Sequence, residues 1–150
     1  MNRFRFFHEL NLVVSEYGEI LDEQGLLDHL LRIYDHPDFR PGMDELISFL
    51  NTRESRVSAD ALREIARAFP RHSDHGATPN LVAVVTESKL GQGLSRLYGA
   101  YADRDGQVTM DVFSSVTEAA DWLDESRGRP AGTSAAVADE VLTAVDCRGP

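Results

Sequence analysis

Residues 81–102 read LVAVVTESKLGQGLSRLYGAYA, and this stretch decides the fold class. Its first part, Leu81–Val85, is a continuous apolar run, which is typical of a central parallel strand covered on both faces. Ser88 can then begin a helix, because the residues that follow it form an apolar stripe with helical spacing. The stripe consists of Leu90, Leu94, Leu97, Tyr98 and Tyr101. A buried strand followed by an amphipathic helix is the repeating unit of an α/β sheet.

The same alternation continues on both sides of this unit. Further strands are predicted at Phe4–His8, Leu12–Tyr17, Glu45–Leu50 and Gln107–Phe113. Further helices are predicted after Asp22, Ser58 and Ser115, each of which can cap a helix N-terminus. The order is therefore β-β-α-β-α-β-α-β-α, which predicts an α/β domain with a mostly parallel sheet of about five strands. The short connection between the first two strands predicts a hairpin, so the N-terminal strand should be antiparallel.

The composition changes after Arg127. Residues 128–133 contain two glycines and a proline and are predicted to form a linker. Ser134 can begin a short helix with Val137, Val141, Leu142 and Val145 on one stripe. We therefore expect residues 1–127 to form the domain. We expect residues 128–150 to form a linker with a short C-terminal helix, which either docks or remains a mobile tail.

Composition narrows the classes of partner and location. The 150 residues include 42% hydrophobic residues and carry a formal net charge of −10, with a pI of about 4.8. An acidic chain is a poor match for nucleic acid or for an anionic membrane surface. The longest apolar runs are too short to span a membrane. The single cysteine, Cys147, cannot form an internal disulfide, which favours a reducing compartment and a cytoplasmic location.

Several local strings, in their order and spacing, resemble the STAS-like (SpoIIAA-like, anti-sigma-factor-antagonist-like) superfamily, and in particular a small, uncharacterised bacterial branch of it. The strings are His36–Gly42, Gly93–Tyr98, and Val112-Phe113 followed by Glu118–Leu123. The resemblance covers about residues 3–126 and implies a STAS-like fold. It also implies a non-enzymatic module for protein interaction or ligand sensing. A likeness in fold to CRAL-TRIO lipid binders adds lipids to the ligand classes.

The first candidate site lies at the start of the second predicted helix. In anti-sigma-factor antagonists, a serine of an Asp-Ser-x-Gly-like string is phosphorylated at the corresponding place. Here the stretch is Asn51–Ser58, without the Asp-Ser pair and without the glycine. Ser58 is the hydroxyl best placed for a phospho-switch, with Arg56 close by and Ser55 as a second candidate. A plain helix cap is the alternative interpretation of Ser58.

The second candidate site lies at the start of the helix that follows Leu81–Val85. Ligands of open α/β sheets bind outside the carboxyl ends of the strands, and helix N-termini favour anions. We therefore expect an anion or a small apolar ligand near this helix. The residues concerned are Ser88, Lys89, Gly91, Gly93, Arg96 and Tyr98. The alternative interpretation is a capped helix whose glycines allow close packing.

Nothing in the sequence forms a catalytic constellation. His72, Asp74 and His75 are metal-ligand types, but they fall in a polar loop without ligand spacing, so no metal and no cofactor are expected. The leading hypothesis is a non-enzymatic module that binds another protein. The second is a small-molecule or lipid-binding module, and the third is a hydrolase or metal enzyme. A homodimer through the predicted edge strand at Gln107–Phe113 is also compatible with the sequence.

Overall fold

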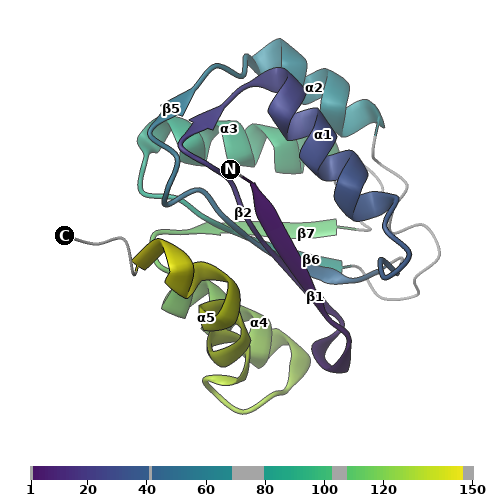
Figure 1. The fold of residues 1–150 in the computed structure, drawn as a ribbon, viewed down its shortest axis with the longest axis vertical. Coiled ribbons are helices and arrows are strands. Elements are labelled where there is room, and N and C mark those ends of the chain that lie inside the picture. The colour runs from purple at the N-terminus through teal and green to yellow at the C-terminus, as the bar shows by residue number, and fades with distance from the viewer. Residues whose placement is uncertain (1, 41, 69–79, 103–107, 147–150) are drawn as a thin grey trace.

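The computed structural model describes residues 2–40, 42–68, 80–102 and 108–146. They form three layers, with a sheet between α1, α2 and α3 on one face and α4 and α5 on the other (Figure 1). The sheet contains β1 Arg3–Phe7, β2 Leu12–Glu16, β4 Asp44–Ser48, β6 Asn80–Val85 and β7 Val108–Phe113. The helices are α1 Glu23–Tyr34, α2 Ala59–Ala68, α3 Lys89–Ala102, α4 Val116–Arg127 and α5 Thr133–Asp146, with a short 3-10 helix, η1, at His8–Leu10.

The strand order in the sheet is β1-β2-β4-β6-β7. Only β1 is antiparallel to its neighbour, and the other three pairings are parallel. The α/β class, the five strands and the antiparallel N-terminal strand are therefore confirmed. The prediction of a central parallel strand at Leu81–Val85 is also confirmed, because β6 lies between β4 and β7 and is parallel to both. An apolar run shows that a strand is covered on both faces, but it does not show how many strands lie on each side.

The sheet separates two apolar cores. Leu81, Ala83 and Val85 of β6 face α4 and α5, and they share a buried cluster with Leu123 and Leu142. The alternate β6 residues Val82 and Val84 face the opposite side, where α1, α2 and α3 lie. Successive strand residues point to opposite faces, so one strand serves both cores.

A second, smaller sheet lies outside the main one. It pairs β3 Ile20–Leu21 with β5 Glu54–Ser55 in parallel. Strands of two residues are too short to show a period of alternation, so they cannot be recognised from the sequence. This small sheet brings the segment after β4 against the segment before α1. The arrangement forms one side of the site described below.

Helix starts follow the expected capping chemistry. The Asp22 side chain accepts a hydrogen bond from the Gly25 N–H at 2.7 Å, and Ser115 accepts one from Glu118 at 3.2 Å. Both residues are N-caps, as predicted. After α4, the chain reverses at Gly128 and leads into α5, which packs on the sheet through Ala138, Val141 and Leu142.

Candidate functional site

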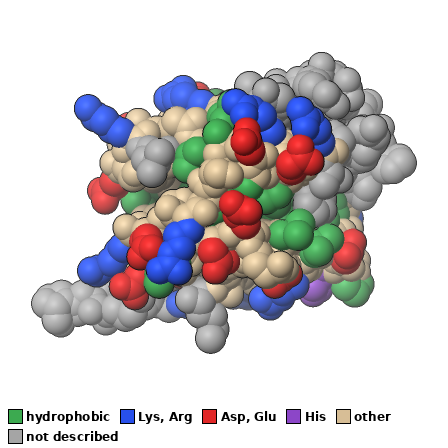
Figure 2. Space-filling model, turned by 90° about the horizontal axis from the view of Figure 1, so that it is seen from above, with side chains coloured by type: hydrophobic (Ala, Val, Ile, Leu, Met, Phe, Trp, Pro, Cys, Tyr) green, Lys and Arg blue, Asp and Glu red, His purple; other side chains and the backbone are tan. Residues whose placement is uncertain are grey.

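A cavity of about 180 Å³ lies between α1, α2, α3 and the sheet, at the carboxyl ends of β4 and β6. Its apolar lining comes from every surrounding element. The apolar residues are Leu21, Leu26, Leu30, Ile47, Phe49, Val57, Leu62, Val84, Leu94 and Met110. On the molecular surface above this helical layer, apolar atoms are visible among charged side chains (Figure 2). The cavity therefore has the mainly hydrophobic lining that is typical of a small-molecule site.

Hydroxyl groups form the uncharged polar part of the lining. Thr52 donates a hydrogen bond to the Gly18 carbonyl at 2.8 Å, which ties the β4–β5 connection to the segment after β2. The Ser88 Oγ accepts from the Gly91 N–H at 3.1 Å, and the Thr86 Oγ1 accepts from the Ser88 N–H at 3.3 Å. Ser95 completes this group on the next turn of α3. The start of α3 is thus held against the end of β6 by hydroxyls that also face the cavity.

Gly91 permits this close approach of α3 to β6. A Cβ atom at Gly91 would lie 2.6 Å from the Thr86 Oγ1, which is too short for any contact. At Gly93, by contrast, a Cβ atom would meet nothing within 4 Å. Gly91 and Gly93 therefore differ in role, because the packing against Thr86 requires a glycine at position 91 but not at position 93.

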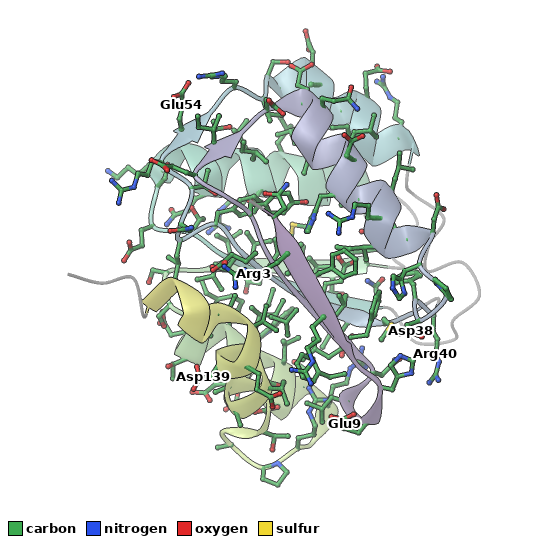
Figure 3. All side chains as sticks on the ribbon, in the orientation of Figure 1. Arg3, Glu9, Asp38, Arg40, Glu54 and Asp139 are labelled. Carbon is green, nitrogen blue, oxygen red and sulfur yellow. The ribbon has the colours of Figure 1, made fainter. Side chains whose placement is uncertain are left out.

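Two charged side chains belong to the described lining, Arg53 and Glu54. Glu54 lies on β5, at the outside of the molecule (Figure 3), and forms an ion pair with Arg56. The hydrogen bond and the charge of Glu54 raise the pKa of the Arg56 guanidinium. Arg53 uses its backbone N–H for a 2.8 Å bond to the Glu19 carbonyl. Within the part of the chain that the structure describes, its guanidinium has neither a hydrogen bond nor an ion pair.

The structure divides the residues of the second predicted site between two faces of α3. Ser88 and Gly91 line the cavity, whereas Lys89, Gly93 and Arg96 are exposed and are not among the described lining residues. Positions 88, 91 and 95 share one helical face, and positions 89, 93 and 96 share another, because residues three or four apart are neighbours on a helix. The Tyr98 side chain lies outside the described parts of the structure.

The residues of the first predicted site are not gathered around one point. Ser58 is exposed and its Oγ accepts a 3.1 Å hydrogen bond from the Ala61 N–H, so it acts as a cap of α2. Arg56 is engaged by Glu54, as described above. Ser55 is half-buried in the cavity lining, where its Oγ accepts from Val57 at 3.5 Å.

Sequence reasoning missed the most informative lining residues, Thr52, Arg53 and Thr86. A usable signal existed, because Thr86 directly follows β6, and Thr52 and Arg53 lie in the short segment between β4 and β5. Ligand sites of α/β sheets form at such ends. For Thr52 and Arg53 the signal is weaker, because the same stretch, Asn51–Ser58, also corresponds to the phosphorylated string of the anti-sigma-factor antagonists.

Neither a metal-ligand cluster nor a membrane-spanning helix occurs in the described ranges, which are residues 2–40, 42–68, 80–102 and 108–146. Within them, no three or more histidine, cysteine, aspartate or glutamate side chains are grouped so that they could hold a metal ion. No described helix is long and apolar enough to cross a membrane. The loop residues His72, Asp74 and His75, as well as Cys147, lie outside the described ranges.

The fold and the cavity together define an α/β domain with an apolar pocket at the carboxyl edge of its sheet. No known family model matches the chain, and no curated protein matches it. A crystal structure of an uncharacterized DUF3478-family protein with a SpoIIAA-like fold, from Shewanella loihica PV-4, is similar to it. The two chains are 14% identical with a TM-score of 0.52, and the match covers 82% of this chain and 92% of the other. The fold is therefore SpoIIAA-like, as the STAS-like resemblance predicted.

Proposed function

We propose that this protein is a non-enzymatic binding module whose cavity holds one small, mainly apolar molecule. The observation that carries the proposal is the cavity itself, formed by three helices and the ends of two parallel strands. Its described lining contains no histidine or cysteine, and its one carboxylate, Glu54, is ion-paired with Arg56. The lining therefore supports binding better than acid–base or nucleophilic catalysis.

The volume limits the size of the ligand. An engineered cavity of about 150 Å³ lined by leucine, isoleucine and phenylalanine binds benzene. The cavity here, at about 180 Å³, fits one aromatic ring with a few further atoms. A long lipid chain exceeds that volume, so the compact end of the lipid and small-molecule class is favoured.

The binding test uses toluene and indole as probes and a pair of matched phenylalanine variants. Leu94→Phe places a larger side chain in the cavity, whereas Leu50→Phe makes the same change at a side chain that is 39% exposed and outside the described lining. We expect ligand-observed NMR to show binding to the wild type and to Leu50→Phe, but not to Leu94→Phe. Binding at about 100 times Kd should stabilise the fold by about 2.7 kcal/mol. No binding below a Kd of about 1 mM, or equal binding to both variants, would contradict the proposal.

A module that binds another protein is the second candidate. It is favoured by two exposed apolar side chains, Ile20 at 50% and Leu50 at 39% exposure, on segments next to the cavity rim. Ser58 and Arg56 remain the predicted switch residues of that candidate. Native mass spectrometry of the protein from its own host separates the two. A small-molecule adduct supports the first candidate, and a phosphate mapped to Ser58 or Ser55 supports the second. The cytoplasmic location also remains a prediction.

A further inference from the structure

We infer that the molecule held in the cavity is a small monocarboxylate, with an apolar body among the leucines and its carboxylate bound by Arg53. This inference rests on the proposed function, because it names the chemical class of the ligand for the same cavity. The evidence for it is the set of polar groups in the lining, together with the hydrogen bonds and ion pairs that each of them already forms.

The charged residues of the lining leave a net positive charge once the ion pair between Glu54 and Arg56 is taken into account. Arg53 and Glu54 are adjacent, but Glu54 is bound by Arg56. Arg53 keeps a guanidinium without a partner among the described residues, and it contributes to the lining. A guanidinium presents several N–H donors in a planar fork that matches a carboxylate in two parallel hydrogen bonds. The lining therefore offers one positive charge that is not ion-paired within the described residues, and one carboxylate would complement it.

The hydroxyls of the lining add donors to this guanidinium. The oxygens of Ser55, Thr86 and Ser88 already accept hydrogen bonds from backbone N–H groups, so each still has an O–H to donate. The Ser95 hydroxyl has no hydrogen bond within the described residues. The lining is thus rich in unused donors, and a carboxylate, which only accepts, is complementary to it.

Size and net charge distinguish a carboxylate from larger anions. About 180 Å³ fits a single substituted ring or a short branched chain, not a nucleotide. The chain carries a net charge of −10, which disfavours ligands of several negative charges. One free arginine balances one carboxylate. Substituted aryl or short alkyl carboxylic acids are therefore the ligand class that fits.

The test compares 3-phenylpropanoate with its neutral amide, 3-phenylpropanamide, by isothermal titration calorimetry. The two probes have the same apolar body, so their difference reports the carboxylate alone. The proteins are the wild type, Arg53→Gln, Arg53→Lys and the control Arg96→Gln, which removes an exposed arginine of α3 that is outside the described lining. Arg53 is exposed, so its substitution leaves the core intact.

We expect the wild type and Arg96→Gln to bind the acid about tenfold or more tightly than the amide. Arg53→Gln should lose this preference while it binds the amide within about twofold of the wild type, and Arg53→Lys should retain part of the preference. Equal affinity of the wild type for acid and amide would overturn the carboxylate inference and leave the proposed function standing. A preference that survives in Arg53→Gln would overturn the role of Arg53. Failure of both probes and of toluene and indole would overturn the proposed function as well.

Discussion

His29 is a histidine that the fold buries almost completely. It lies on α1, is 1% exposed, and neither ring nitrogen has a hydrogen bond within the described residues. Its ring contacts the edges of Phe4 and Tyr17, with centroids 5.6 and 4.5 Å away. Burial, together with the nearby Arg32 charge, lowers the pKa of His29 from 6.5 to about 4. The folded protein therefore holds this imidazole neutral under conditions in which the unfolded chain protonates it.

This difference predicts a loss of stability in weak acid. Between pH 6.5 and about 4 the unfolded state binds one more proton at this site, so the free energy of unfolding falls as the pH falls. We expect a loss of about 2 kcal/mol between pH 7 and pH 5, measured by urea denaturation. His29→Leu should remove most of this dependence. The control is His36→Gln, at a side chain that is 37% exposed, and it should keep the dependence. A His29→Leu profile parallel to that of the wild type would contradict the prediction.

Gly91 and Gly93 offer a matched pair at the residue scale. Both lie in α3, where alanine is favoured over glycine by up to about 1 kcal/mol. We expect Gly93→Ala to stabilise the protein by about 0.5–1 kcal/mol, because its Cβ atom meets open space. Gly91→Ala should instead destabilise by about 1–3 kcal/mol and weaken ligand binding, because its Cβ atom collides with Thr86. Thermal denaturation checks both, and equal effects would show that α3 does not need the close approach.

At the scale of elements, α5 is attached by a buried polar cluster as well as by its apolar stripe. Asp124 of α4, 1% exposed, accepts hydrogen bonds from the Ser134 hydroxyl at 2.6 Å and from the Arg129 Nε at 3.1 Å. Burial alone would raise the pKa of Asp124, but the bonds from Ser134 and the Arg129 charge outweigh it and lower that pKa. The carboxylate is therefore ionised and joins α4 to the first turn of α5.

Removal of this carboxylate should loosen α5. We expect Asp124→Ala to cost about 3 kcal/mol, because it leaves the buried donors of Arg129 and Ser134 without an acceptor. Glu140→Ala is the control on the same helix. It breaks only the exposed pair with Arg5, whose side chains are 49% and 58% exposed, and should cost less than about 1 kcal/mol. Urea denaturation gives the costs, and hydrogen exchange at Ala138 reports the docking of α5. Similar costs for both variants would refute the role of the cluster.

At the scale of the whole molecule, the sheet has two edges, and β7 is one of them. The sequence left open a homodimer through this strand, and that remains untested. On β7 the Val112 N–H is bonded to the Asp111 Oδ1 at 2.8 Å, and Asp111 is exposed. A charged side chain on an edge strand opposes pairing with a second strand.

We therefore expect the protein to be mainly monomeric at micromolar concentration. Asp111→Val removes both the charge and the cap of the Val112 N–H, and it should raise the dimer fraction in sedimentation velocity. Asp139→Val, an exposed aspartate on α5, is the control for the loss of one negative charge. A wild type that is already a dimer, unaffected by Asp111→Val, would contradict the prediction.

The sequence by itself determined the order and type of the main elements. The continuous apolar run at Leu81–Val85 and the helical stripe of Leu94 and Leu97 can each be recognised from the local sequence, because such a pattern depends only on which faces of one strand or helix are buried. Capping residues such as Asp22 and Ser115 likewise act within one turn. The antiparallel first strand followed from its short connection to the second.

Only the tertiary structure decided the strand order, the docking of α5 and the site. A pattern shows that a face is buried but not which element covers it, so the middle position of β4 could not be read from its residues. The cavity combines Arg53 from the segment after β4, Leu26 from α1 and Ser95 from α3, which are distant in the chain. Their proximity results from the packing of three helices on one sheet face, where long-range contacts and not local preferences determine the geometry.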